Sequence, residues 1–139
     1  MAISDFLTSF KIAASGLHAQ MARMRVASEN LANTDSTGKT PGADPYRREI
    51  PTFKSVFDSE LGAYQVQVGG VVPDKTAFEQ RYEPGHPAAD ANGYVKYPNI
   101  NPLVEQMDMS SAQRTYEANL NVVTATRQML SRTIDILRG

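Results

Sequence analysis

The chain of 139 residues contains no cysteine. This absence excludes disulfide bonds, thiolate metal sites and cysteine nucleophiles. The sequence also lacks an apolar run of the roughly 20 residues that a membrane-spanning helix needs, so we expect no direct membrane insertion. Its 14 basic and 15 acidic residues nearly balance, which gives a formal net charge of −1. A protein with this balance has no electrostatic footprint for nucleic acid, and we expect no nucleic-acid partner.

The first residues do not resemble a secretory signal peptide. Asp5 and Lys11 interrupt any apolar core there, and no basic segment precedes it. If the protein leaves the cytoplasm, we therefore expect it to do so without cleavage of a signal peptide.

Apolar side chains near the N-terminus recur at alternating steps of three and four residues, with Ser28 as the single polar member. The series is Ile3, Leu7, Phe10, Ala14, Leu17, Met21, Met24, Ser28 and Leu31. This spacing is typical of a helix with one apolar seam. We predict a helix over residues 1–33, capped at its start by Ser4 or Asp5. Turn-forming residues from Asn33 onwards would end it.

A second seam lies near the C-terminus, where Arg127 fills the single polar position. The series is Tyr116, Leu120, Val123, Arg127, Leu130, Ile134 and Leu137. Because a proline disrupts a helix interior, Pro98 and Pro102 prevent this helix from beginning much earlier. We therefore predict a second seam helix within residues 102–139.

The central residues 34–101 have a different pattern, rich in proline and glycine. Residues 64–68 alternate between polar and apolar types, as a half-buried strand does, and residues 94–97 do so more weakly. Asn92 and Gly93 form a dipeptide that favours a tight turn. The predicted fold class is α+β: two long terminal helices form a coiled-coil-like layer, with a linker and a small β-rich insert between them.

No catalytic or metal-binding arrangement is recognisable in the sequence. The two histidines, His18 and His86, are far apart in the chain, and a metal site would need them close in space. Neighbouring carboxylates such as Asp58 and Glu60 are more often solvated than catalytic. We expect no enzymatic activity, no cofactor and no metal, although a small hydrolase acting from the central region stays a minor alternative.

The seams alone allow two interpretations. They can pair with each other inside one chain, which would make the protein a soluble helical-hairpin adaptor or interaction module. They can also be buried against helices of other subunits. Each large apolar side chain that stays in water forgoes about 1.5–3 kcal/mol of burial energy, so either interpretation requires a partner surface for seams of this length.

Three segments, in the expected order, resemble the flagellar axial protein family. Residues 13–17 read Ala-Ala-Ser-Gly-Leu, and residues 26–34 contain Asn-Leu-Ala-Asn, which is similar to the family's N-terminal signature. Residues 112–119 contain Tyr-x-Ala-Asn, which is similar to its C-terminal signature. The central segment 82–101, with Gly-Tyr-Val-Lys-Tyr-Pro-Asn, resembles the short proximal rod proteins of this family.

This resemblance implies a structural subunit of the flagellar basal-body rod. Such a subunit would polymerise through its terminal helices and help to transmit motor torque across the periplasm for motility. The implied partners are copies of itself, other rod proteins, and the inner-membrane ring and export-gate adaptor proteins at the rod base. Export would follow the flagellar type III route.

The seams and the resemblance together predict the residues of the subunit interface. Four of them, Asn30, Asn33, Tyr116 and Asn119, are candidates for hydrogen bonds at helix ends or between helices. The full set is Leu7, Phe10, Leu17, Met21, Met24, Asn30, Leu31, Asn33, Tyr116, Asn119, Leu120, Val123, Leu130, Ile134 and Leu137.

Overall fold

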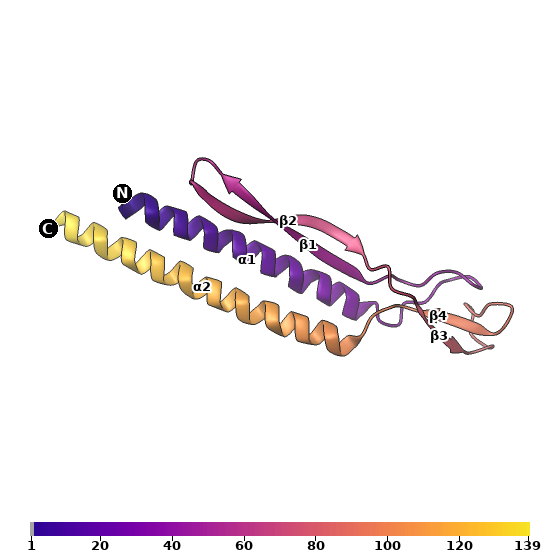
Figure 1. The fold of residues 1–139 in the computed structure, drawn as a ribbon. Coiled ribbons are helices and arrows are strands. Elements are labelled where there is room, and N and C mark those ends of the chain that lie inside the picture. The colour runs from indigo at the N-terminus through magenta and orange to yellow at the C-terminus, as the bar shows by residue number, and fades with distance from the viewer. Residues whose placement is uncertain (1) are drawn as a thin grey trace.

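A computed structural model describes residues 2–139 and confirms the α+β fold class. Two long helices, α1 (Ala2–Ala32) and α2 (Pro102–Arg138), lie side by side and antiparallel, with both chain ends at one end of the molecule (Figure 1). Four strands lie between them in sequence and form two antiparallel hairpins. The strands are β1 (Glu49–Asp58), β2 (Ala63–Pro73), β3 (Glu79–Tyr82) and β4 (Tyr94–Tyr97).

The start of α2 follows from local sequence. Asn101 has an extended backbone, and its side chain accepts a hydrogen bond from the backbone N–H of Leu103 at 3.1 Å. Pro102 occupies the first helical position, where its missing N–H costs nothing. These two residues place the helix start where the sequence predicts it.

The predicted cap at the start of α1 is wrong. The helix already includes Ala2, so Ser4 and Asp5 both lie inside its first turn rather than before it. Asp5 still favours the helix there, because a negative charge in the first turn interacts well with the helix dipole. The other end agrees with the sequence, since α1 ends at Ala32 and a turn follows from Asn33.

Small side chains form the contact between the two helices. Ala13, Ala19, Val26 and Ala27 of α1 are buried, as is Ala112 of α2. Gly16 lies on the same face of α1, and its Cα faces Asn119 across the contact. Small residues therefore bring the two helices close together, and half-buried seam residues such as Val123 and Leu130 pack beside them.

The β1–β2 hairpin lies along α1 on the side away from α2 (Figure 1). The predicted strand at residues 64–68 is confirmed inside β2. β1 was not predicted. A register shift between Thr52 and Phe53 bends the hairpin opposite Gly70, whose φ of 118° favours glycine.

The β3–β4 hairpin lies at the end of the molecule opposite to the chain ends (Figure 1). Tyr82 and Tyr94 pair across it, with ring centroids 5.3 Å apart in an edge-to-face arrangement. Val95 is fully buried, and Ala88 in the segment between the two strands is buried as well. The predicted turn is present at Gly93, which has a φ of +84°. The predicted strand at 94–97 is likewise confirmed as β4.

Candidate assembly surface

Helix α1 contacts α2 through one side and the β1–β2 hairpin through another, and its remaining flank is open to solvent. The predicted N-terminal seam lies on this flank. Met21 is 51% exposed, and Ile3, Leu7 and Phe10 are also exposed. Leu17, Met24 and Leu31 are half-buried. The large apolar side chains of the seam are thus accessible in a single chain although its two helices are paired.

The C-terminal seam continues this surface on α2. Leu120 is 43% exposed, and Ile134 and Leu137 are exposed as well. Tyr116, Val123 and Leu130 are half-buried towards α1. We call the exposed flank that carries the seams of both helices the seam face. The helices therefore pair with each other and still present apolar residues outward, so the two interpretations of the seams do not exclude each other.

The two seams meet in a groove near the chain ends, which we call the terminal groove. It has a volume of about 360 Å³ and is lined mainly by apolar side chains. The one charged side chain in its lining is Arg127. The lining residues are Phe6, Leu7, Phe10, Val123, Thr126, Arg127 and Leu130.

A second apolar stripe on α2 was not predicted. It follows the same spacing of three and four residues, on a different side of the helix from the first seam. Ala118 and Ala125 are its small apolar members, and Ser111, Arg114 and Arg132 interrupt it. Five large side chains in it are exposed: Val104, Met107, Val122, Met129 and Ile136. The polar residues that interrupt this stripe make its apolar spacing less regular than that of the seam.

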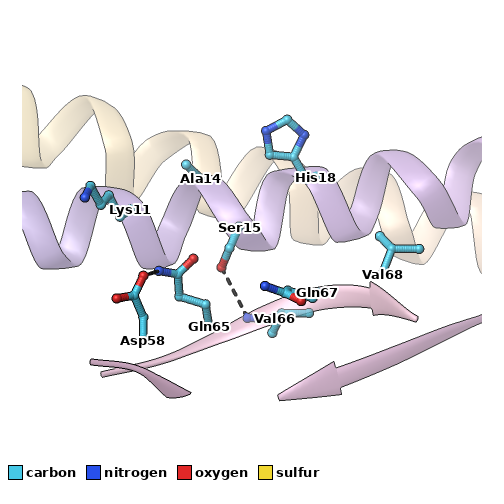
Figure 2. A pocket seen from close by; sticks show the side chains of 9 residues that line it. All are labelled: Lys11, Ala14, Ser15, His18, Asp58, Gln65, Val66, Gln67 and Val68. Atoms are coloured by element: carbon cyan, nitrogen blue, oxygen red, sulfur yellow. Dashed lines mark hydrogen bonds between the residues drawn. The ribbon is translucent and has the colours of Figure 1, made fainter. Parts of the chain in front are cut away.

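A cavity of about 640 Å³ separates α1 from the β1–β2 hairpin. Figure 2 shows the single hydrogen bond that bridges it, from the backbone N–H of Val66 to Ser15 Oγ at 3.4 Å. His18 points away from the hairpin, and Lys11 lies at the same level as Asp58. Packing contacts, more than hydrogen bonds, therefore join the hairpin to this part of α1.

Polar residues join the two helices at the end of the helix pair that is opposite to the chain ends. Asn30, which is 1% exposed, donates from Nδ2 to the backbone carbonyl of Glu49 at 2.8 Å and to Glu105 Oε2 at 3.2 Å. Its Oδ1 accepts the backbone N–H of Glu49 at 2.9 Å. One amide group thus joins the end of α1, the start of β1 and the first turn of α2.

Arg48 completes this arrangement. Its Nε donates to Glu105 Oε1 at 2.5 Å, and its Nη1 donates to Asp74 Oδ2 at 3.2 Å. Its backbone N–H donates to Asn99 Oδ1 at 2.8 Å. We call these five residues, Asn30, Arg48, Asp74, Asn99 and Glu105, the polar clasp. Because Glu105 is only 1% exposed, its charge is stable there mainly through Arg48.

The pKa of Asp74 lies below its ordinary value, mainly because of a residue outside the clasp. A hydrogen bond from the backbone N–H of Thr76 lowers this pKa most, and the Thr76 side chain and then the hydrogen bond and charge of Arg48 lower it further. The carboxylate is therefore held in its ionised form, as its partnership with Arg48 requires.

The structure gives the two asparagines of the Asn-Leu-Ala-Asn segment different tasks. Asn30 fixes β1 to both helices, whereas Asn33 caps the end of α1. Asn33 Nδ2 donates to the backbone carbonyl of Glu29 at 2.8 Å, and its Oδ1 accepts from Ser36 Oγ at 2.9 Å. The predicted helix-end hydrogen bonds are present at both positions. Asn30 makes them inside the chain, so its side chain is not on the seam face.

Tyr116 and Asn119 both lie in or beside the contact between the helices. Tyr116 is half-buried, and the Asn119 side chain packs directly over Gly16. An ion pair between Arg23 and Asp108 crosses the same contact. The segments quoted for the N-terminal and C-terminal signatures therefore meet each other in the fold.

Residues of the central segment 82–101 make hydrogen bonds that connect parts of the fold. The Tyr97 hydroxyl donates to the Glu83 carboxylate at 3.1 Å, and Asn99 belongs to the clasp. Burial raises the pKa of Tyr97, and the hydrogen bond to Glu83 raises it further. This segment thus connects the β3–β4 hairpin to the start of α2.

Within residues 2–139, no three His, Cys, Asp or Glu side chains cluster closely enough to hold a metal ion. No helix in this part of the chain is long and apolar enough to cross a membrane. The chemically distinctive surfaces of the molecule are its exposed apolar stripes.

Comparison with known proteins agrees with this geometry. Residues 91–136 match the family described as flagellar basal body rod FlgEFG protein C-terminal. The chain is 52% identical to flagellar basal-body rod protein FlgC of Agrobacterium fabrum over 129 residues, which cover 93% of each chain. It is 40% identical to FlgC of Salmonella typhimurium, covering 94% of this chain and 96% of that one. It is 37% identical to FlgC of Bacillus subtilis, covering 92% and 95% respectively.

These similarities extend over nearly the whole chain, and they confirm the resemblance inferred from the three sequence segments. They also account for the absence of a recognisable catalytic arrangement. The chain belongs to the FlgC family of flagellar basal-body rod proteins, and it is a structural subunit of the rod rather than an enzyme.

Proposed function

We propose that the chain enters the rod by burying its seam face against the helices of neighbouring rod subunits. The observation that carries this proposal is the exposure of large apolar side chains along both seams, although the helices are already paired. Soluble monomers rarely expose apolar patches of this extent, and such patches mark interaction sites. The second stripe on α2 provides a further surface for the same purpose, on a different side of the helix.

The proposed interface contains the exposed and half-buried seam residues. The two groups contribute differently, because exposed side chains gain the most from burial by a partner. Asn30 and Asn33 support this surface from behind by fixing the end of α1. The interface residues of the proposal are Leu7, Phe10, Leu17, Met21, Met24, Leu31, Tyr116, Leu120, Val123, Leu130, Ile134 and Leu137.

The partners and the role of the assembled subunit are part of the same proposal. Neighbours would include copies of this chain and other rod proteins, and at the rod base the inner-membrane ring and export-gate adaptor proteins. The helix pair would help to carry motor torque along the rod. Export without cleavage of a signal peptide remains a prediction from the family resemblance.

Single charges on the seam face test the proposal. Met21→Asp and Leu120→Asp place a carboxylate where a partner helix would exclude water, and a buried unpaired charge is costly. Both side chains are exposed in the free chain, so its stability should change by only about 0.5 kcal/mol. We expect loss of swimming motility and loss of the variant from isolated basal bodies.

The matched control is Gln128→Asp, which adds the same charge at an exposed polar position of α2, two turns from Leu120. This variant should assemble and swim normally. Motile cells whose rods contain Met21→Asp or Leu120→Asp at normal levels would disprove the proposed role of the seam face.

A further inference from the structure

The tip of the β1–β2 hairpin is a rigid structure. Asp58 Oδ1 accepts the backbone N–H groups of Glu60 and Leu61 at 2.9 Å and 3.2 Å. Asp58 Oδ2 accepts from Gln65 Nε2 at 2.8 Å, as Figure 2 shows. Gly62 completes the turn with a φ of +62°, which favours glycine. A surface turn fixed in this way loses little conformational entropy when a partner binds it.

Two aromatic side chains project from this rigid turn. Phe57 and Tyr64 face each other across the hairpin, with ring centroids 5.1 Å apart in an edge-to-face arrangement. They are 53% and 65% exposed, so their own chain covers neither of them fully. Rigid aromatic side chains of this kind are the usual anchors of protein interfaces. We call residues 57–64 the aromatic tip.

The aromatic tip is acidic, and the terminal groove is basic. Glu60 lies on the tip, and no ion pair among residues 2–139 involves it. Arg127 lines the terminal groove, and it too has no ion-pair partner within the described residues. The rest of the groove is almost entirely apolar, so the two surfaces are complementary in both polarity and charge.

These two surfaces lie on different sides of one molecule. The hairpin flanks the side of α1 that carries Ile12, since Ile12 and Val66 line the same cavity. Phe10, which lines the terminal groove, lies roughly 160° around the helix from Ile12. The aromatic tip therefore cannot reach the groove of its own chain.

The two surfaces nevertheless lie at the same height along the helix pair. Asp58 and Gln65 border the same cavity as Lys11, one residue after Phe10 in α1. A second copy placed beside the first, without a large shift along the helix axis, would bring one tip to the other groove. Contact between two different surfaces of identical copies does not close after two subunits, and it produces rings or helical arrays.

We propose that the aromatic tip of one copy docks into the terminal groove of a second copy, with Phe57 and Tyr64 as anchors and Glu60 paired with Arg127. This docking rests on the proposed assembly through the seam face and refines it. At the terminal groove, which is one end of that face, the neighbour's contribution is the aromatic tip, and helices of neighbours cover the rest of the face. It assigns the hairpin a task in contacts between copies that the seam residues alone do not supply.

A cysteine crosslink tests the docking directly, because the natural chain has no cysteine. We would introduce Glu60→Cys and Arg127→Cys together, isolate basal bodies and treat them with a short bismaleimide whose linker contains a disulfide. The proposed ion pair joins two long side chains, so it holds the Cα atoms farther apart than the roughly 7 Å of a direct disulfide, and the linker spans this gap. We expect a product at twice the 15.2 kDa mass of the chain, with higher multiples, that disappears on reduction.

The matched control pairs Arg127→Cys with Glu79→Cys, an exposed acidic position on β3. This variant, and each single cysteine variant, should remain monomeric. Assembled rods in which the Glu60→Cys and Arg127→Cys chain stays monomeric would overturn the docking. A product formed by one cysteine variant alone, or only with a different rod protein, would overturn it as well.

A charge exchange provides a second readout if the cysteine variant assembles poorly. Glu60→Arg and Arg127→Glu should each lower, several-fold, the amount of the chain recovered in basal bodies. The two changes together should restore it, and an equal or larger loss in the double variant would overturn the docking. These results are distinguishable from failure of the seam-face proposal, which is decided separately by the Met21→Asp and Leu120→Asp variants.

Discussion

The side-chain nitrogen of Asn119 lies 2.7 Å from the position that a Cβ atom would occupy at Gly16. These two residues belong to signature segments at opposite ends of the sequence, and they meet at the contact between α1 and α2. The absence of a side chain at residue 16 provides the space that Asn119 fills. A glycine that would ordinarily weaken a helix interior is therefore required by the packing of the helix pair.

We predict that Gly16→Leu destabilises the folded chain by about 1–3 kcal/mol, because overfilling a tight contact displaces its neighbours. Gly16→Ala should have a much smaller effect, since the end of the Asn119 side chain can move and alanine favours the helix. Urea unfolding measures both changes. The double variant Gly16→Leu with Asn119→Ala should recover part of the loss. Equal stability of the Leu and Ala variants would contradict this account.

Glu105→Gln should cost about 1.5–3 kcal/mol, because it removes the charge that pairs with Arg48 and places an amide NH2 opposite a hydrogen-bond donor of the clasp. Arg48 would keep Asp74 as a partner, which limits the loss. The control is Glu29→Gln, which breaks the exposed pair with Arg25 and should cost about 0.3–0.5 kcal/mol. Thermal or urea unfolding measures the loss of stability in each variant. A larger effect at Glu29 than at Glu105 would mean that the clasp does not stabilise the fold.

The lowered pKa of Asp74 makes stability depend on pH in acid. Its folded-state pKa lies below the ordinary value of 3.8, so its ionised form stabilises the native state. This contribution is complete at pH values well above 3.8 and is lost as the pH falls through 3.8 towards the folded-state pKa. Asp74→Asn should therefore lower stability at about pH 6, and the difference from the natural chain should shrink towards about pH 3.

Urea unfolding at a series of pH values measures this difference. Gln80→Asn is a suitable control, because neither residue titrates and any difference from the natural chain should not vary with pH. A stability difference for Asp74→Asn that stays constant from neutral to acid pH would rule out the proposed contribution of its charge.

The second stripe on α2 provides a prediction for assembly. Val122→Asp should leave the free chain folded, because Val122 is 49% exposed. It should nevertheless lower the amount of the chain in basal bodies, since the stripe would be buried by a neighbour on another side of α2. Asn121→Asp, at the adjacent exposed position, is the matched control. Normal incorporation of Val122→Asp would show that only the seam face contacts other subunits.

The parts of the fold that depend on local sequence were predictable. Asn101 and Pro102 specify the start of α2 by themselves, and Gly93 specifies its turn. β1 was missed because Pro51 and the register shift at Thr52 break the alternation by which a strand is recognised. Its pairing with β2 also depends on residues distant in sequence, which single-sequence patterns do not report.

The two apolar seams could be predicted because large apolar residues at heptad spacing are visible in a sequence. Contacts that depend on the folded structure could not. The small residues that join α1 to α2, such as Ala13 and Ala112, do not stand out by type or spacing. The task of Asn30 was similarly hidden, because its partners Glu49 and Glu105 lie 19 and 75 residues away.

The polar clasp has one more consequence, which concerns alignment. Two helices with repeated apolar residues can slide past each other by seven residues and still match apolar to apolar, at little cost in energy. Directional hydrogen bonds at a single site do not allow this. Asn30, Arg48 and Glu105 can meet in only one alignment of the helices, so the clasp selects one pairing from several that hydrophobicity alone would accept.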